Sequence, residues 1–230
     1  MSLILSLLIM TALAAAIRTP LKRFPLLFYG LAVAVSAAGL YCTLVPSPSP
    51  LIRAFAFALQ KGQLSFSLFA LVMFIGVFAN DSALRRYFNP VRAELSILAA
   101  ILIAGHFALY LRNYLLFAGD LFSFNANILA SLALALALLV LLVVLTLTSF
   151  NAVKRRMNAG TWKAVQKLAY PFFGIVYFHL LGYLLPSALS GSTSAQINLA
   201  VYSIIFITYA ALRIRKALRD REASEREAEA

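Results

Sequence analysis

The chain has 230 residues, of which 63% are hydrophobic and only 12% are charged, a balance that excludes an ordinary soluble domain. Its formal net charge of +12 would by itself also suit a nucleic-acid-binding surface. A helix needs about 20 apolar residues to cross a bilayer, and alternating barrel strands of about ten residues are absent. The composition therefore predicts an all-α, polytopic transmembrane helical bundle.

About seven spans are expected in chain order. The first five are the apolar runs 1–17, 24–45, 64–79, 95–111 and 128–148. Residues 168–212 then contain no Asp, Glu, Lys or Arg for 45 residues. The turn-forming sequence PSALSGSTSAQ interrupts this stretch at residues 186–196, which predicts two further helices.

The connections between the spans have different expected forms. Residues 51–61 follow the turn PSPSP (46–50) and are expected to form a short helix or loop on the outer surface. Residues 112–125 are expected to form an aromatic-rich outer loop. The resulting division is an additional N-terminal helix and turn at 1–23, a membrane domain at 24–212 and a charged helical tail at 213–230.

The distribution of Lys and Arg predicts a topology and argues against nucleic-acid binding. Seventeen of the 20 basic residues fall on one side of the predicted spans, and the other side holds only Arg53, Lys61 and Arg112. Lys and Arg are retained in the cytoplasm. The chain is therefore expected in a bacterial inner membrane, with its N-terminus outside and its C-terminus inside.

The first apolar run has two interpretations, because Ala14, Ala15 and Ala16 resemble the cleavage site of a signal peptide. A signal peptide normally carries its positive charge before the apolar run. Here the charges follow the run, which favours a retained span. Cys42 is the only cysteine, so an intrachain disulfide is excluded, and the absence of a C-x-x-C-H motif excludes haem attached through thioethers.

The ionisable residues within the spans are few, although such residues are costly in a membrane and therefore often functional. No span holds an Asp, Lys or Arg in its interior, and Glu94 stands at a cytoplasmic boundary. This pattern disfavours an ion-coupled carrier and leaves a pathway for a neutral solute open. The two histidines of the chain, His106 and His179, both lie in apolar spans.

The depths of these histidines match, since His106 stands five residues before Leu111 and His179 seven residues before Pro186. Two axial imidazoles suffice to hold haem iron, whereas a structural zinc needs four ligands. Tyr110 and Tyr183 each follow a histidine by four residues. The candidate cofactor-binding residues are His106, His179, Gly105, Gly182, Tyr110, Tyr183 and Arg112. The glycines would leave room for a porphyrin, and the tyrosines would bind its propionates. Interhelical hydrogen bonding by the histidines remains an alternative.

The segments VRAELSILAAILIAGHFALYL and LVVLTLTSFNAVKRRMNAGTWKAVQKLAYPFFGIVYFHLLGYL resemble the ferric-reductase-like transmembrane domain family. The nearest form is the MsrQ (YedZ) haem-bearing membrane subunit of the methionine-sulfoxide reductase system. A T-S-x-x-A motif at Thr148, Ser149 and Ala152, followed by Trp162 and then His179, carries much of the resemblance. It covers residues 24–215, so 1–17 resembles an addition to the usual six spans.

The resemblance implies that His106 and His179 ligate the iron of one b-type haem near the outer face. Gln166 stands where the family has another histidine, and Arg92 or Ala93 occupies the other inner ligand position. A second haem held by two histidines is therefore not expected.

The expected function is that of a membrane cytochrome b that receives electrons from quinol or a cytoplasmic flavin reductase, with FMN or a quinone near the cytoplasmic side as further ligands. The implied acceptor is a periplasmic molybdenum-containing reductase. A subunit of another redox complex, or a haem-free transporter or assembly protein, remains the alternative.

Overall fold

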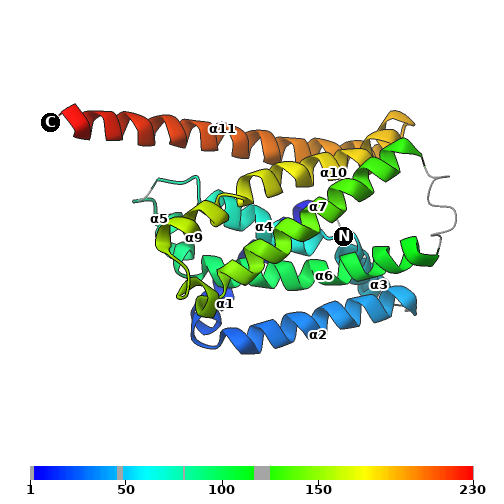
Figure 1. Cartoon of the computed structure of the whole chain (residues 1–230). Coiled ribbons are helices and arrows are strands. Elements are labelled where there is room, and N and C mark those ends of the chain that lie inside the picture. Colours follow the sequence, from blue (N-terminus) through cyan, green and yellow to red (C-terminus); the bar gives the residue numbers. More distant parts are fainter. Residues whose placement is uncertain (1–2, 46–48, 80, 117–124, 230) are drawn as a thin grey trace.

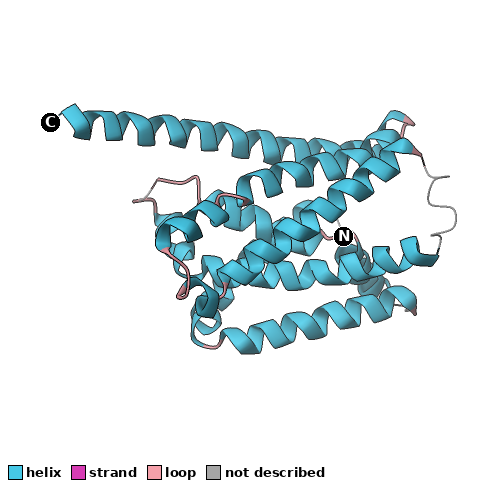
Figure 2. Ribbon diagram, viewed as in Figure 1, coloured by secondary structure: helices cyan, strands magenta, loops and turns pink. Residues whose placement is uncertain are grey.

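The computed structural model describes residues 3–45, 49–79, 81–116 and 125–229. Within these ranges the chain is almost entirely helical and contains no strand (Figure 2). The helices are α1 (Leu3–Arg23), α2 (Pro25–Leu44), α3 (Pro50–Gln60), α4 (Gln63–Ile75), α5 (Ala83–Phe88), the 3-10 helix η1 (Asn89–Val91), α6 (Arg92–Leu116), α7 (Ala126–Ser149), α8 (Asn151–Lys154), α9 (Ala159–Gln166), α10 (Ala169–Leu189) and α11 (Thr193–Glu229). The predicted all-α fold is confirmed.

The long helices lie side by side along one direction, as expected for a membrane bundle (Figure 1). Six helical segments of the described chain are long and apolar enough to cross a bilayer. A seventh span results if α3 and α4, which meet at a bend of 54°, together form one broken span. The chain is therefore a multi-pass membrane protein, and seven spans is the upper count.

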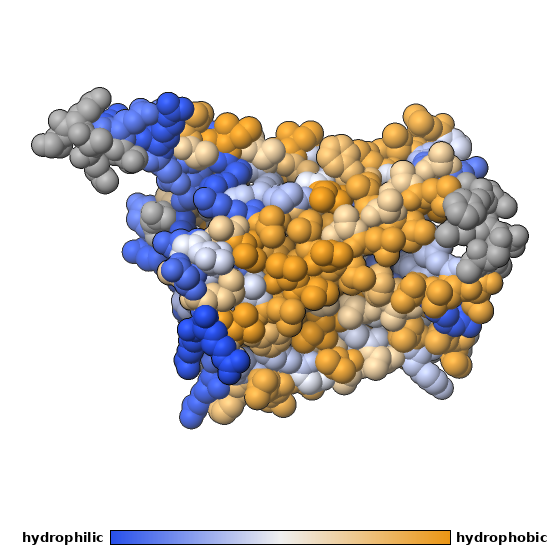
Figure 3. Space-filling view, in the orientation of Figure 1, coloured by the Kyte–Doolittle hydropathy of each residue, from blue (hydrophilic) through white to orange (hydrophobic). Residues whose placement is uncertain are grey.

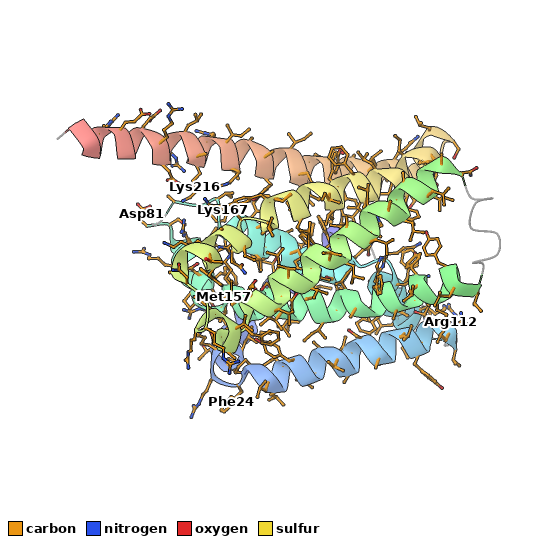
Figure 4. All side chains as sticks on the ribbon, viewed as in Figure 1. Phe24, Asp81, Arg112, Met157, Lys167 and Lys216 are labelled. Atoms are coloured by element: carbon orange, nitrogen blue, oxygen red, sulfur yellow. The ribbon has the colours of Figure 1, made fainter. Side chains whose placement is uncertain are left out.

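Polar and apolar side chains separate along the bundle. On the face drawn in Figure 3, apolar side chains cover the middle of the bundle and hydrophilic side chains gather at one end. We call this the basic end; it carries Phe24, Asp81, Met157, Lys167 and Lys216, whereas Arg112 lies at the opposite end (Figure 4). Large apolar side chains such as Leu26 on α2 and Leu189 on α10 are 79% exposed. Such exposure suits a surface that faces lipid.

Helix α4 is the centre of the bundle, and both of its faces are buried. Leu64, Leu68 and Ile75 pack with side chains of α1 and α6 in one apolar cluster. Phe66 and Met73 pack with side chains of α10 and α11 in a second cluster. A helix that is apolar all round requires such burial. Helix α1 belongs to this core, because its Leu3, Met10, Ala14 and Leu21 side chains are buried.

Two predicted connections are partly helical, and the turn expected within residues 186–196 is confirmed at residues 190–192. Helix α6 continues to Leu116, so residues 112–116 of the expected outer loop are helical. Residues 117–124 of that loop lie outside the described chain. Residues 46–48 of the expected PSPSP turn also lie outside it. Helix α10 continues through Pro186 to Leu189. Pro186 has no N–H for the Gly182 carbonyl four residues earlier, and Asn127 Nδ2 donates to that carbonyl at 3.1 Å instead. This side-chain hydrogen bond from α7 allows the helix to pass the proline.

The helical form expected for residues 51–61 is confirmed, and one face of this helix is packed inside the bundle. Helix α3 packs against α2 and α6, and its Ala56, Ala58 and Leu59 side chains are buried. Small side chains at two of these positions allow close approach of neighbouring helices. Helix α3 is therefore part of the bundle and ends directly beside α6.

Candidate functional site

His106 is held by a main-chain carbonyl from another part of the chain. It lies on α6, half-buried, and its Nδ1 is 2.6 Å from the carbonyl oxygen of Gln60, the last residue of α3. The imidazole also contacts the ring of Tyr110, with centroids 4.7 Å apart. The expected one-turn relationship between His106 and Tyr110 is thus present.

His179 is held in the same manner from a different helix. It lies on α10, and its Nδ1 is 2.9 Å from the carbonyl oxygen of Ser131 on α7. The ring of Tyr183 is its neighbour one turn later, with centroids 5.3 Å apart. Both histidines of the chain therefore use the same ring nitrogen on a backbone acceptor.

These hydrogen bonds determine the tautomer of each ring. A carbonyl oxygen can only accept, so Nδ1 must carry the proton and Nε2 keeps its lone pair. Neither Nε2 has a hydrogen-bond partner among the described residues. Histidines that bind metals typically donate their other ring N–H to a carbonyl or carboxylate in this way. The two side chains therefore fit the role of axial imidazoles toward a haem iron.

The two histidines lie on different helices, α6 and α10, that share a packing neighbour. Helix α7 packs against both α6 and α10. A hydrogen bond between the hydroxyls of Tyr114 and Tyr183 joins α6 to α10. No group of three or more His, Cys, Asp or Glu side chains in the described chain is arranged to hold a metal ion.

The polar side chains around His106 include one that the sequence did not single out. Lys61 Nζ donates to the Tyr110 hydroxyl at 3.4 Å, which places a cation beside the histidine. Its signal in the sequence is that it is one of three basic residues on the outer side. Arg112 is exposed and contacts the neighbouring Asn113, so it lies farther toward the end of the bundle.

The two glycines beside the histidines have a packing role. A Cβ on Gly105 would lie 3.5 Å from the backbone oxygen of Ser36 on α2, and a Cβ on Gly182 would overlap Ser131 Oγ on α7. Both glycines thus face neighbouring helices. The expectation that they leave space for a porphyrin is not supported, because the space that each provides is occupied by another helix.

A separate cavity of about 310 Å³ lies at the basic end, between α4, α6, α7, α9 and α10. Its lining includes two cations, Arg92 and Lys154, neither of which pairs with an acid among the described residues. Amide and aromatic side chains complete much of the wall: Asn89, Asn151, Gln166, Phe69, Phe172 and Trp162. The cavity therefore suits an amphipathic or planar molecule that carries negative charge or hydrogen-bond acceptors.

The motif residues come together at this cavity. Trp162 Nε1 donates to the Thr148 carbonyl at 2.9 Å, and Gln166 Nε2 donates to Thr148 Oγ1 at 2.8 Å. Lys154 Nζ lies 4.3 Å from the centroid of the Trp162 ring. Gln166 ends α9 and is separated from α10 by a short turn, so it and His179 do not belong to one continuous helix.

The helical bundle, with two histidines held on main-chain carbonyls, defines the class of multi-pass membrane proteins. Residues 61–178, just over half of the chain, match the family described as ferric reductase like transmembrane component, and the chain belongs to this family. The resemblance inferred from the sequence is thereby confirmed at the level of the family.

One relative is an uncharacterized protein of Treponema pallidum (strain Nichols). It is 36% identical over 226 residues, which cover 96% of this chain and 62% of the relative. The chain thus spans less than two thirds of that protein's length. No solved structure gives a significant match.

Proposed function

We propose that the chain is a b-type cytochrome subunit that carries electrons across a bacterial inner membrane. His106 and His179 would be the axial ligands of one haem in the outer half of the bundle. The observation that carries this proposal is the matched hydrogen bonding of the two rings, in which each Nδ1 donates to a carbonyl and each Nε2 keeps its lone pair. Bound haem would supply a one-electron carrier.

The residues around the histidines have separate tasks in this proposal. The Gln60 and Ser131 carbonyls hold the orientation and tautomer of the imidazoles. Tyr110 with Lys61, and Tyr183 with Tyr114, supply hydroxyl and ammonium groups that would bind the haem carboxylates. Arg112, near the surface, would contribute positive charge at the exit. The apolar spans exclude water and so keep the dielectric around the cofactor low.

The cavity at the basic end is the proposed site of electron input. Its level on α6, at Ser96, is ten residues from His106, or about 15 Å by helical rise. A quinone would use the aromatic and amide lining, and a flavin nucleotide would in addition use Arg92 and Lys154 for its phosphate. The unpaired cations favour the flavin. The positions that would carry inner haem ligands by family resemblance, Arg92 or Ala93 and Gln166, all line this cavity without a histidine.

The charge bias of the bundle indicates its orientation in the membrane. We infer that the basic end faces the cytoplasm, with the N-terminus outside and the C-terminus inside. Electrons would then pass from a quinol or a cytoplasmic flavin reductase to an acceptor outside. By the resemblance to the methionine-sulfoxide reductase membrane subunit, that acceptor is a periplasmic molybdenum-containing reductase.

A dithionite-minus-oxidised absorbance spectrum of the purified full chain tests the proposal. A low-spin b-type spectrum is the expected result. A colourless protein would contradict it and favour a haem-free transporter or assembly protein. A haem spectrum with no transfer to a periplasmic reductase would point to a subunit of another membrane redox complex.

A further inference from the structure

The break between α3 and α4 lies directly beside His106. Gly62 occupies this break with φ of 67° and ψ of 13°, the left-handed conformation. A Cβ at this position would lie 2.9 Å from Ile103 Cδ1 and 3.7 Å from His106 Nδ1. Glycine adopts this conformation without the steric cost that an L side chain incurs. Glycine at position 62 therefore allows both the left-handed break and the close approach of the chain to His106.

The break also determines which carbonyl reaches the imidazole. The last carbonyls of a helix lack N–H partners from within the helix. Around the break, Lys61 N bonds to Phe57 O and Gly62 N bonds to Leu59 O. No backbone N–H donor to Gln60 O is present among the described residues, so this oxygen accepts from His106 at 2.6 Å.

The acceptor of His179 is different in kind. Ser131 lies inside α7, which runs from Ala126 to Ser149. A carbonyl in a helix interior already accepts the N–H four residues later, so Ser131 O is shared between the helix and the histidine. Its distance to His179 Nδ1 is the longer of the two, 2.9 Å against 2.6 Å.

We propose that the α3–α4 break makes the two imidazoles unequal and thereby lowers the reduction potential of the iron between them. This inference rests on the proposed function. A stronger hydrogen bond from Nδ1 increases the basicity of the imidazole, and a more basic axial ligand stabilises the ferric form. His106 is therefore the stronger donor, and Gly62 is a positioning residue that keeps the Gln60 carbonyl against its ring.

A redox titration of the purified, haem-loaded full chain with Gly62→Ala tests this inference. Displacing the Gln60 carbonyl should raise the midpoint potential while haem content remains that of the parent. An effect of about tenfold on the ratio of reduced to oxidised haem corresponds to about 59 mV for one electron. Gly174→Ala is the matched control, because a Cβ there meets nothing within 4 Å, and it should not change the potential. An unchanged or lowered potential in Gly62→Ala would overturn the inference.

Two further measurements apply if Gly62→Ala does not accumulate. Gly62→Asn introduces a residue that tolerates the left-handed conformation better than alanine. Its Cβ would still lie 2.9 Å from Ile103 Cδ1, so a smaller rise in potential is expected. Pulsed electron paramagnetic resonance of the ferric parent, labelled with ¹⁵N-histidine, should show two distinct couplings for the remote ring nitrogens. One shared coupling would refute the inequality. Absence of low-spin haem in the parent chain would instead refute the proposed function.

Discussion

Lys22 Nζ lies 2.8 Å from Glu94 Oε1, and this ion pair joins the end of α1 to the start of α6. The carboxylate is the buried partner, since its side chain is 8% exposed and that of Lys22 is 54% exposed. Glu94 Oε2 has no hydrogen-bond partner among the described residues. The pair thus compensates a carboxylate that the packing of α1 has removed from water, at the basic end of the bundle.

Removing the cation should destabilise the bundle more than removing both charges. Lys22→Met leaves Glu94 buried and unpaired, and we expect a loss of about 1–2 kcal/mol, a reduced value because Lys22 is half exposed. Thermal unfolding in detergent measures this. The double variant Lys22→Met with Glu94→Gln should recover most of the loss. Equal stability of the parent and the Lys22→Met variant would show that the ion pair contributes nothing.

Replacement of either histidine should remove the low-spin haem signal. His106→Ala or His179→Ala deletes one imidazole and, with it, the hydrogen bond to the Gln60 or Ser131 carbonyl. Low-spin haem should be lost or replaced by weak high-spin haem, whereas membrane insertion should continue because the spans stay apolar. Absorbance spectra of purified variants provide the measurement. Gln166→Ala should keep the parent spectrum, and normal spectra in both histidine variants would refute the ligand assignment.

Haem stoichiometry should be one per chain. The chain has two histidines, and the lining of the cavity at the basic end contains none. A pyridine haemochrome assay against protein concentration gives the ratio. A value near two would mean that a side chain other than histidine holds a second haem at the cavity.

The cations of the cavity should affect electron input without affecting the haem. Arg92→Gln together with Lys154→Gln should slow reduction of the haem by reduced FMN about tenfold, because attraction of the phosphate is lost. Stopped-flow absorbance measures this rate, and the haem spectrum should be unchanged. Lys163→Gln serves as control, since Lys163 is exposed on α9 and does not line the cavity. An unchanged rate in the double variant would exclude this cavity as the flavin site.

Reporter fusions should place the basic end in the cytoplasm. Fusions after Arg23, Arg92 and Arg221 should all report a cytoplasmic location, because 17 of the 20 basic residues belong to that side. Periplasmic signals at both Arg92 and Arg221, with Arg23 still cytoplasmic, would instead mean that α3 and α4 do not together cross the membrane. In that case the span count would be six.

The positions of the spans could be predicted because burial in lipid requires long apolar runs, a property of composition. The connections were less predictable. Helix α10 passes Pro186 because Asn127, on another helix, supplies the missing hydrogen bond to Gly182. Helix α3 packs within the bundle because Ala56 and Ala58 meet neighbouring helices. Both outcomes depend on partners that are distant in sequence.

The candidate site divides in the same manner. The sequence by itself determined the membrane class, the charge bias and the presence of two histidines in apolar spans, since these follow from the order and polarity of residues. Only the tertiary structure decided that the Gln60 and Ser131 carbonyls hold those rings, that Lys61 lies beside Tyr110, and that Arg92 and Gln166 line one cavity. A main-chain carbonyl accepts a hydrogen bond from a distant side chain only where its helix ends or where another helix approaches it. Both situations depend on packing between segments far apart in the chain.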